Sequence, residues 1–486
     1  GTCDMLDDKL KALWTRISPP QKAAFFGCFL SGYLVHLYVF TNIIPNSDGL
    51  SRIFDPQQMT VSGRWFLHFA SYFNGFTQMP AVIGLFSVLF LALAAALAVS
   101  LLGIRSRALS ALSGALMAAF PAVGYTFLYL FTASAYCFAI FLAVLSVSLA
   151  RRGRWHWLAG CLLLACSMGT YQAYVTVAIG LSLLVIFRET LDPSASFSAT
   201  LRLGVRLMLF LAAGAVLYYG ILLVFLQVKD LELLSYLGMD AASSGYPFSR
   251  LPGLLLDTYK QVAAFFFLPG SANTFTSGWM AVLDLAALAL GGGCFLLCMG
   301  QEGLWRARWR PLGGLAMLAL LPLGINFGQI LSPWSAPTPL MKYAFVLVYL
   351  AVVLLADRAL PAAGAGAAGV HKAAGVDAGN GAFLLHKFLH GSPVGGGAEF
   401  RCGGHLDPGG VVYDEHLPLE GGTAHVHQLD GVLGHILVRL LKSGELRHRT
   451  AGNHGVPRQD LVHLALREAD AGQKIHGAGF GHAGDE

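Results

Sequence analysis

The sequence contains little charge. Only 12% of its 486 residues are Asp, Glu, Lys or Arg, 55% are hydrophobic, and the mean hydropathy is +0.61. Soluble globular domains carry about 25% charged residues, so the composition excludes an ordinary soluble enzyme and a disordered chain. The basic residues lie in short clusters between long apolar runs, which is not the single basic face of a nucleic-acid binder. We expect the lipid bilayer, and no nucleic acid, to be a partner of this chain.

Histidine is scarce before Leu360 and tryptophan is absent after it, so the composition of the chain changes near this residue. Residues 1–360 contain all 8 tryptophans and 3 of the 16 histidines, with 22 basic against 14 acidic residues. Residues 361–486 contain no tryptophan, 26 of the 57 glycines, and 10 basic against 13 acidic residues. We predict a cytoplasmic segment at 1–22, a transmembrane domain at 23–358 and a Gly/Ala/His-rich tail at 359–486. The tail is either poorly ordered, with a shifted reading frame as its origin, or a genuine cytoplasmic extension.

Long uncharged runs indicate membrane helices, because one span needs about 20 mainly apolar residues. With the N-terminus in the cytoplasm, 16 of the 22 basic residues of the body fall on the inner side, as the positive-inside rule favours. The run Trp155–Phe187 is divided into two short helices at Ser167–Tyr171, since one helix would move Arg188, Arg202 and Arg206 outside. The prediction is an all-α, polytopic helical bundle with long outer loops after spans 1 and 7. The ten predicted spans are 23–45, 80–102, 108–122, 126–150, 155–169, 172–187, 205–227, 277–300, 311–331 and 341–357.

The first outer loop collects charged groups at the membrane edge. Asp48 directly follows the apolar run, Arg52 and Asp55 come next, and the sequence Ser-Gly-Arg-Trp ends at Trp65. A carboxylate in a half-dry site is suited to general-base work, and arginines such as Arg64 bind phosphate through forked hydrogen bonds. The alternative is structural: Asn-Ser-Asp-Gly is an ordinary turn sequence, and Arg52 with Asp55 would form a surface pair.

The same residues resemble the Gtr-type bacterial membrane glucosyltransferases, which belong to the GT-C class. The resemblance rests on the outer loop with Asp48, on the Ser62–Trp65 patch, and on Gly169–Tyr174, which is similar to the Tyr-Gln element of that family. It covers roughly residues 20–358. It implies that a hexose, glucose above all, passes from a polyprenyl-phosphate-linked donor to a lipid-linked or surface glycan such as O-antigen. The reaction would take place on the periplasmic face of the bacterial inner membrane.

The resemblance also implies roles for single residues. Asp48 would be the catalytic base that takes a proton from the acceptor hydroxyl, while the leaving lipid phosphate is stabilised by arginine. For the Tyr-Gln pair, hydrogen bonding at a tight helix hairpin is an equal alternative to lining the sugar site. The expected substrate-binding residues are Arg52, Arg64, Asp55, Tyr171 and Gln172.

No metal ligand and no certain cofactor is predicted. Asp48 and Asp55 alone make a poor metal cage, although Mg²⁺ or Mn²⁺ could bind through them and a donor phosphate. A transporter or flippase for lipid-linked sugars is the main alternative function, and such proteins have inverted repeats and intramembrane polar residues. This chain shows no evident repeat and few intramembrane charges. A glycan polymerase or ligase has the same donor class and topology and stays open.

The second outer loop and the segment after residue 337 hold further candidates. Leu251, Leu254, Leu255 and Tyr259 recur at helical spacing, which predicts an amphipathic helix. It would lie in the membrane interface or cover the acceptor. Lys342 is a further cation at the outer edge, near any lipid phosphate.

Overall fold

The structure is a computed structural model that describes residues 14–44, 54–233, 248–269, 276–301, 304–333 and 337–360. The chain divides into two units, Gly1–Val394 and Gly395–Glu486, and all described residues belong to the first. The tail predicted at 359–486 lies, beyond Leu360, outside the described residues. Most of the predicted N-terminal segment at 1–22 lies outside them too.

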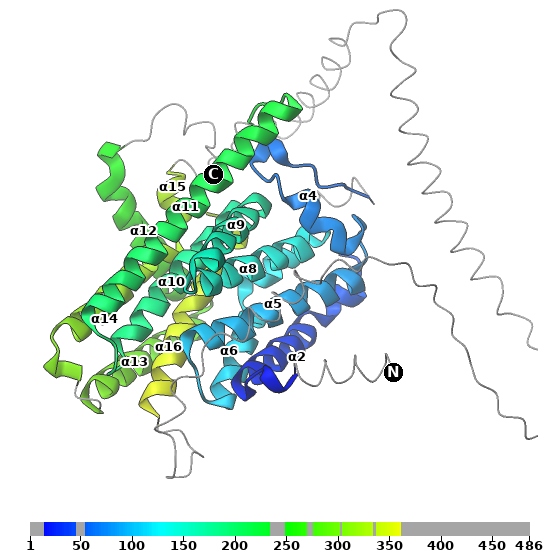
Figure 1. Ribbon diagram of the computed structural model, residues 1–486. Coiled ribbons are helices and arrows are strands. Elements are labelled where there is room, and N and C mark those ends of the chain that lie inside the picture. Colours follow the sequence, from blue (N-terminus) through cyan, green and yellow to red (C-terminus); the bar gives the residue numbers. More distant parts are fainter. Residues whose placement is uncertain are drawn as a thin grey trace, which may run out of the picture. The chain divides into compact units, whose positions relative to one another are not determined.

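The described residues are predominantly helical, and the predicted all-α membrane bundle is confirmed (Figure 1). Eight helical stretches within the described ranges are long and apolar enough to cross a membrane, and each matches one predicted span. The two remaining predicted spans fall on the 17-residue helices α9 (Arg154–Thr170) and α14 (Trp309–Ile325). A helix of that length measures about 25 Å, somewhat less than the hydrocarbon core of about 30 Å. The eight stretches are Pro19–Thr41, Pro80–Leu102, Arg107–Leu128, Leu130–Ala150, Gln172–Thr190, Phe197–Lys229, Gly278–Gly300 and Pro339–Ala359.

Local sequence signals set several helix ends. Ser18 and Gln21 form a capping box at the start of α2, with the Ser18 N–H donating to the Gln21 Oε1 at 2.9 Å. Pro121 holds Phe120 in an extended conformation, which separates α6 from α7 close to the end of the predicted span 108–122. The other helices are α2 (Pro19–Thr41), α4 (Leu67–Ala70), α5 (Pro80–Leu102), α6 (Arg107–Ala119), α7 (Pro121–Leu128), α8 (Leu130–Ala150), α10 (Val175–Thr190), α11 (Phe197–Lys229), α12 (Leu251–Phe267), α13 (Gly278–Gln301), α15 (Phe327–Leu331) and α16 (Val346–Ala359).

The division of the run Trp155–Phe187 into two helices is confirmed. Helix α9 ends at Thr170, and Tyr171 is extended, with φ −156° and ψ 114°. A short 3₁₀ helix, η3 (Gln172–Tyr174), then leads into α10. Helix α9 packs against α8 and α11, whereas α10 packs mainly against α14. The two halves therefore diverge from the break at Tyr171, and each is held by other helices.

Arginines collect at one end of the bundle, where they bind the last carbonyl groups of helices. Arg188 donates to the Leu101 carbonyl of α5 at 2.9 Å, and Arg206 donates to the Ala150 carbonyl of α8 at 2.7 Å. Such contacts satisfy carbonyls that have no partner within the helix and oppose the negative end of the helix dipole. The topology predicted from loop charge places these arginines on one side of the membrane. In the structure they lie at one end of the bundle. This basic end is defined by Arg105, Arg151, Arg188, Arg206 and Arg310.

A buried carboxylate completes the basic end. Asp357, near the end of α16, accepts hydrogen bonds from the backbone N–H groups of Arg105 (2.9 Å) and Ser106 (2.8 Å). Its side chain is 2% exposed. In the loop after α10, burial raises the pKa of Asp192, but hydrogen bonds from Ser194 and the nearby charge of Arg358 hold it below its usual value. The lowered pKa keeps the Asp192 carboxylate ionised among the arginines.

The predicted amphipathic helix of the second outer loop is α12, and several of its apolar side chains pack on the bundle. Leu254, Val262, Phe265 and Phe266 are buried, and α12 packs against α13, α14 and α15. An interfacial helix would turn that face to lipid. Of the predicted face, Leu254 is buried and Tyr259 is 38% exposed. The buried side chains of the second half, Val262, Phe265 and Phe266, lie against the bundle.

Glycines allow α2 and α6 to pack closely. A Cβ atom at Gly114 would lie 2.1 Å from the Ala24 carbonyl oxygen, and one at Gly27 would lie 2.4 Å from the Ala111 carbonyl oxygen. Small residues at helix contacts are typical of membrane proteins, where packing rather than the hydrophobic effect drives association.

We expect Gly114→Leu to prevent the close contact of α2 with α6, because no backbone shift of a few tenths of an ångström would admit the side chain. The free energy of unfolding should fall by more than the roughly 1–3 kcal/mol that ordinary overpacking costs. Gly124→Leu on α7 is the matched control, since no atom lies within 4 Å of a Cβ atom there. Thermal unfolding of the detergent-solubilised variants measures the difference. Equal unfolding temperatures would contradict the proposed packing.

Candidate active site

Arg64 is the last residue of a tight turn. The 3₁₀ helix η1 (Thr60–Ser62) is followed by Gly63, whose φ of +77° lies in the left-handed region that favours glycine. Met59 and Arg64 form an isolated β-bridge, in which the Arg64 N–H donates to the Met59 carbonyl at 3.1 Å. We call residues 59–64 the Arg64 turn.

The Arg64 turn lies at the end of the bundle opposite the basic end. Further along the same loop, Asn74 donates to the Phe131 carbonyl at the start of α8 at 3.2 Å, whereas the end of α8 carries Arg151. The short helix α4 (Leu67–Ala70) of this loop is visible at one end of the bundle (Figure 1). We call this the site end.

The loop is fastened to the end of α9 by two neighbouring residues. The Phe66 N–H donates to the Gly169 carbonyl at 2.7 Å, and the Trp65 ring covers Gly169 so closely that a Cβ atom there would lie 2.5 Å from it. On the other side, the Trp65 ring stacks on Phe225 of α11 at 5.7 Å between centroids. Only glycine fits at position 169, so the Ser-Gly-Arg-Trp patch and the Gly-Thr-Tyr-Gln stretch depend on each other.

Arg64 rests on a cluster of tyrosines. Its Nη1 donates to the Tyr136 hydroxyl at 3.0 Å, and its Cζ lies 4.9 Å from the Tyr171 ring centroid. The rings of Tyr136 and Tyr171 stack at 4.7 Å, and Tyr174 meets the edge of Tyr171 at 5.2 Å. A guanidinium held over an aromatic face keeps its charge and loses little further freedom when it binds an anion. The site end therefore contains the Arg64 guanidinium, whose orientation is fixed by its contacts with Tyr136 and Tyr171.

The side chain of Gln172 hydrogen-bonds to the Arg64 turn. Its Nε2 donates to the Ser62 carbonyl at 2.8 Å and to the Tyr218 hydroxyl at 3.1 Å. The Tyr218 hydroxyl donates in turn to the Gly63 carbonyl at 3.1 Å. Two carbonyls of the turn thus have partners from η3 and α11. The side-chain amide of Gln172 acts here on the loop, which is a different contact from hydrogen bonding within a helix hairpin.

The remaining predicted residues divide into two groups. Asp55 organises its own part of the loop: its Oδ1 accepts from the Gln57 N–H at 2.9 Å, and its N–H donates to the Phe76 carbonyl at 3.1 Å. Asp48 and Arg52 lie outside the described residues, in the segment 45–53 that leads into Phe54. The structure thus brings Arg64, Tyr171 and Gln172 together, and it gives Asp55 a turn-forming contact.

Sequence reasoning missed Tyr136, Tyr174 and Tyr218 as parts of the site. Tyr136 and Tyr218 lie within uncharged runs, in α8 and α11, where an aromatic residue reads as ordinary core. The available signal was weak: a tyrosine in a membrane helix usually places its hydroxyl against a polar partner.

Lys342 is a second cation near this cluster. It belongs to η6 (Pro339–Phe345), which packs against η3, and its side chain is buried, with the residue 5% exposed. Its Nζ lies 5.9 Å from the Phe265 ring centroid. Within the described part of the chain, no group of three or more His, Cys, Asp or Glu side chains is arranged to hold a metal ion.

The sequence model of the glucosyl transferase GtrII family matches residues 37–355, from the end of α2 to α16. The chain belongs to this family. The predicted resemblance is thereby confirmed, and membership makes this GtrII protein a membrane glucosyl transferase with a sugar donor and an acceptor. No curated protein and no solved structure matches the chain. The matched range contains the Arg64 turn, the tyrosine cluster and Lys342.

We expect Tyr218→Phe to lower glucosyl transfer about tenfold, because losing this hydroxyl leaves buried polar partners unsatisfied at a cost of about 1–3 kcal/mol and loosens the Arg64 turn. Tyr219→Phe is the matched control, since the neighbouring residue is 54% exposed. The assay is glucose transfer by membranes that contain equal amounts of inserted protein. Equal activities of the two variants would show that the Gly63 contact does not support the site.

Proposed function

We propose that this GtrII protein transfers glucose from a polyprenyl-phosphate-linked donor to a lipid-linked or surface glycan such as O-antigen. The reaction would take place at the periplasmic face of the bacterial inner membrane, with the N-terminus in the cytoplasm. The observation that carries this proposal is the meeting of the Arg64 turn with Gly169–Gln172, at the end of the bundle opposite the basic end. By the positive-inside rule the basic end faces the cytoplasm, so the site end faces outward, where a lipid-linked sugar rather than a nucleotide sugar is within reach.

The proposed reaction is a direct displacement at the anomeric carbon. Asp48 accepts the proton of the acceptor hydroxyl while that oxygen forms its bond to the anomeric carbon. The bond from the anomeric carbon to the donor phosphate breaks, and its electron pair leaves with the lipid phosphate. Arg64, joined by Arg52 of the same loop, stabilises the negative charge of that phosphate. A phosphate is already a good leaving group, so no separate acid is required.

The contacts refine the proposed roles of the Tyr-Gln pair. Tyr171 supports the Arg64 guanidinium from one side, and Gln172 holds the carbonyl of Ser62. We infer that both residues position the arginine as well as line the sugar site. Asp55, whose carboxylate is engaged with the Gln57 N–H, serves mainly to shape the loop.

Family membership favours glucosyl transfer over the alternative functions. A flippase would move the lipid-linked sugar without breaking a bond, and a polymerase or ligase would join glycans. The GtrII family is described by transfer of a glucosyl group, which agrees with a cationic group placed for a leaving phosphate.

Asp48→Asn should abolish most glucosyl transfer, with a loss of about 10²–10⁴-fold, because an amide does not accept the proton. Asp55→Asn is the matched control in the same loop, since asparagine also bonds the backbone two residues on. We expect this control to retain most of its activity. The measurement is release of polyprenyl phosphate and appearance of glucosylated acceptor in membranes. A fully active, correctly inserted Asp48→Asn protein would refute the base role.

Arg64→Lys tests the phosphate role separately. Lysine keeps the charge but lacks the planar fork, and it reaches neither Tyr136 nor a phosphate in the same manner. We expect KM for the donor to rise about tenfold while KM for the acceptor changes little. A rise in the acceptor KM alone would assign Arg64 to the other substrate.

A further inference from the structure

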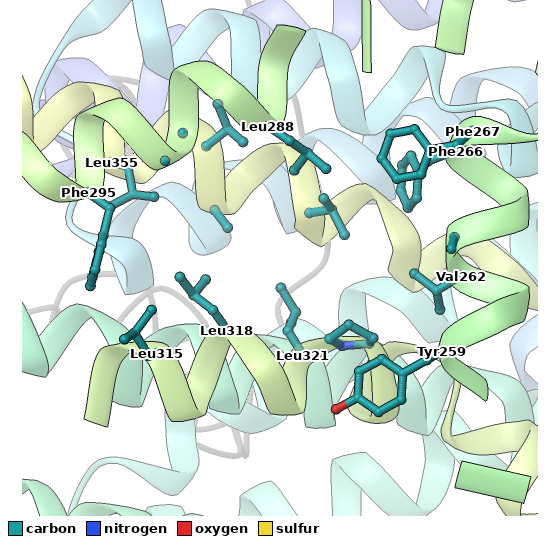
Figure 2. Close-up of a pocket in the computed structure, with 17 residues that line it drawn as sticks. Tyr259, Val262, Phe266, Phe267, Leu288, Phe295, Leu315, Leu318, Leu321 and Leu355 are labelled. Atoms are coloured by element: carbon teal, nitrogen blue, oxygen red, sulfur yellow. The ribbon is translucent and has the colours of Figure 1, made fainter. Parts of the chain in front are cut away.

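Grooves on the bundle differ in whether charged side chains line them. The groove between α12, α13, α14 and α16 has a volume of about 440 Å³ and is lined by apolar residues apart from Tyr259 (Figure 2). Lipid tails are as apolar as leucine, so a groove without a charged group has little by which to select an occupant. At the basic end, by contrast, arginines line two grooves between α9 and α11.

The two grooves at the basic end share Trp157 of α9 and Arg206 of α11. The Trp157 Nε1 donates to the Arg206 carbonyl at 3.4 Å, which joins the two helices there. One groove, of about 470 Å³, continues along α11 and includes Arg202. The other, of about 430 Å³, continues to the start of α9 and includes Arg154. We call the two together the α9–α11 groove.

Arg154 and Arg202 have donors that the fold does not use. Arg202 donates through Nε to the Ser198 carbonyl at 3.3 Å, and its terminal nitrogens have no hydrogen-bond partner among the described residues. The Arg154 guanidinium lies over the Trp155 ring, 5.6 Å from its centroid. Within the described part of the chain, neither arginine forms an ion pair with a carboxylate. Guanidinium groups of this kind are suited to forked hydrogen bonds with phosphate oxygens.

Exposed apolar side chains lie beside these arginines in the same groove. Leu201 and Leu209 of α11 are each 55% exposed, and Leu158 of α9 is 46% exposed. Helix α11 has 33 residues. Its length of about 50 Å exceeds the hydrocarbon core of about 30 Å, so its start reaches the headgroup layer. Tryptophans such as Trp157 are typical of that layer. The groove therefore offers cations and an apolar surface to one ligand.

We propose that the α9–α11 groove binds an anionic phospholipid, with Arg154 and Arg202 bonding its phosphate and with its acyl chains lying along Leu201 and Leu209. The residues that line the groove include no carboxylate that would pair with the ammonium of a zwitterionic lipid. Basic pockets between membrane helices on the cytoplasmic side are suited to anionic headgroups. The assignment to the cytoplasmic leaflet rests on the orientation in the proposed function, whereas the groove and its ligand do not.

Two pairs of exposed arginines provide a matched test. Arg154→Gln combined with Arg202→Gln removes two charges from the groove. Arg107→Gln combined with Arg308→Gln removes two exposed arginines that line neither part of it. Both double variants lose the same charge, so a general attraction to an anionic bilayer weakens equally in both. A difference between them therefore reports a site. Circular dichroism checks that both double variants keep the helix content of the wild type.

The probe is phosphatidylglycerol with a photoreactive group beside its headgroup, present as a minor lipid in phosphatidylcholine nanodiscs that hold the full-length protein. We expect labelled peptides from α9 and from the first half of α11. Labelling should fall about tenfold in the groove variant and stay near the wild-type level in the control variant. Unlabelled phosphatidylglycerol should compete with the probe, whereas additional phosphatidylcholine and inorganic phosphate should not.

The labelling needs no glucosyl transfer, so its outcome is independent of the proposed reaction. An equal loss of labelling in both double variants would show that only diffuse charge attracts the lipid. Competition by inorganic phosphate would show that the groove binds an anion without requiring acyl chains. Labelling that maps to other helices would place the lipid elsewhere. Each of these three results would overturn the proposal.

Discussion

The contact between Trp65 and Gly169 is the constraint on which the site depends. The indole lies where a side chain at position 169 would be, and the next residue bonds the Gly169 carbonyl. A loop that follows the first membrane helix is thereby attached to the end of the α9 helix, about a hundred residues later in the chain. Arg64 precedes Trp65 and Tyr171 lies two residues after Gly169, so this one contact brings the guanidinium over the ring. The hydrogen bonds from Gln172 to Ser62 and from Tyr218 to Gly63 then fix the turn in this position.

Positive charge has two different uses in this protein, and the surroundings of each arginine separate them. At the basic end, arginines bind helix-terminal carbonyls such as those of Leu101 and Ala150, so their donors are used within the fold. At the site end, Arg64 bonds a neutral hydroxyl and lies over a neutral ring. The ring of Tyr171 and the Tyr136 hydroxyl fix the orientation of the Arg64 guanidinium without removing its charge. The proposed phosphate site therefore lies at the end of the bundle where an arginine is held by tyrosines.

The bilayer also shapes how substrate selectivity can arise. Hydrocarbon burial gives little preference between lipids, so polar contacts must select a lipid-linked substrate. Phe265 of α12 lies 5.9 Å from the Lys342 Nζ, so this helix reaches the η6 segment that packs against η3. The buried apolar side chains of α12 are explained by protein contacts, which amphipathic spacing alone does not reveal.

The sequence by itself determined the membrane class, the positions of the helices, the break at Tyr171 and the collection of arginines on one side. Hydrophobic length and loop charge are local properties, so they can be read residue by residue. Only the tertiary structure decided that Gln172 bonds the Arg64 turn, that Asp55 shapes its own loop, and that Tyr218 and Lys342 lie near the site. These contacts join residues far apart in the chain, and within an apolar run a tyrosine that packs in the core looks the same as one that supports a site. Their roles follow from which helices meet, and that depends on close packing between segments.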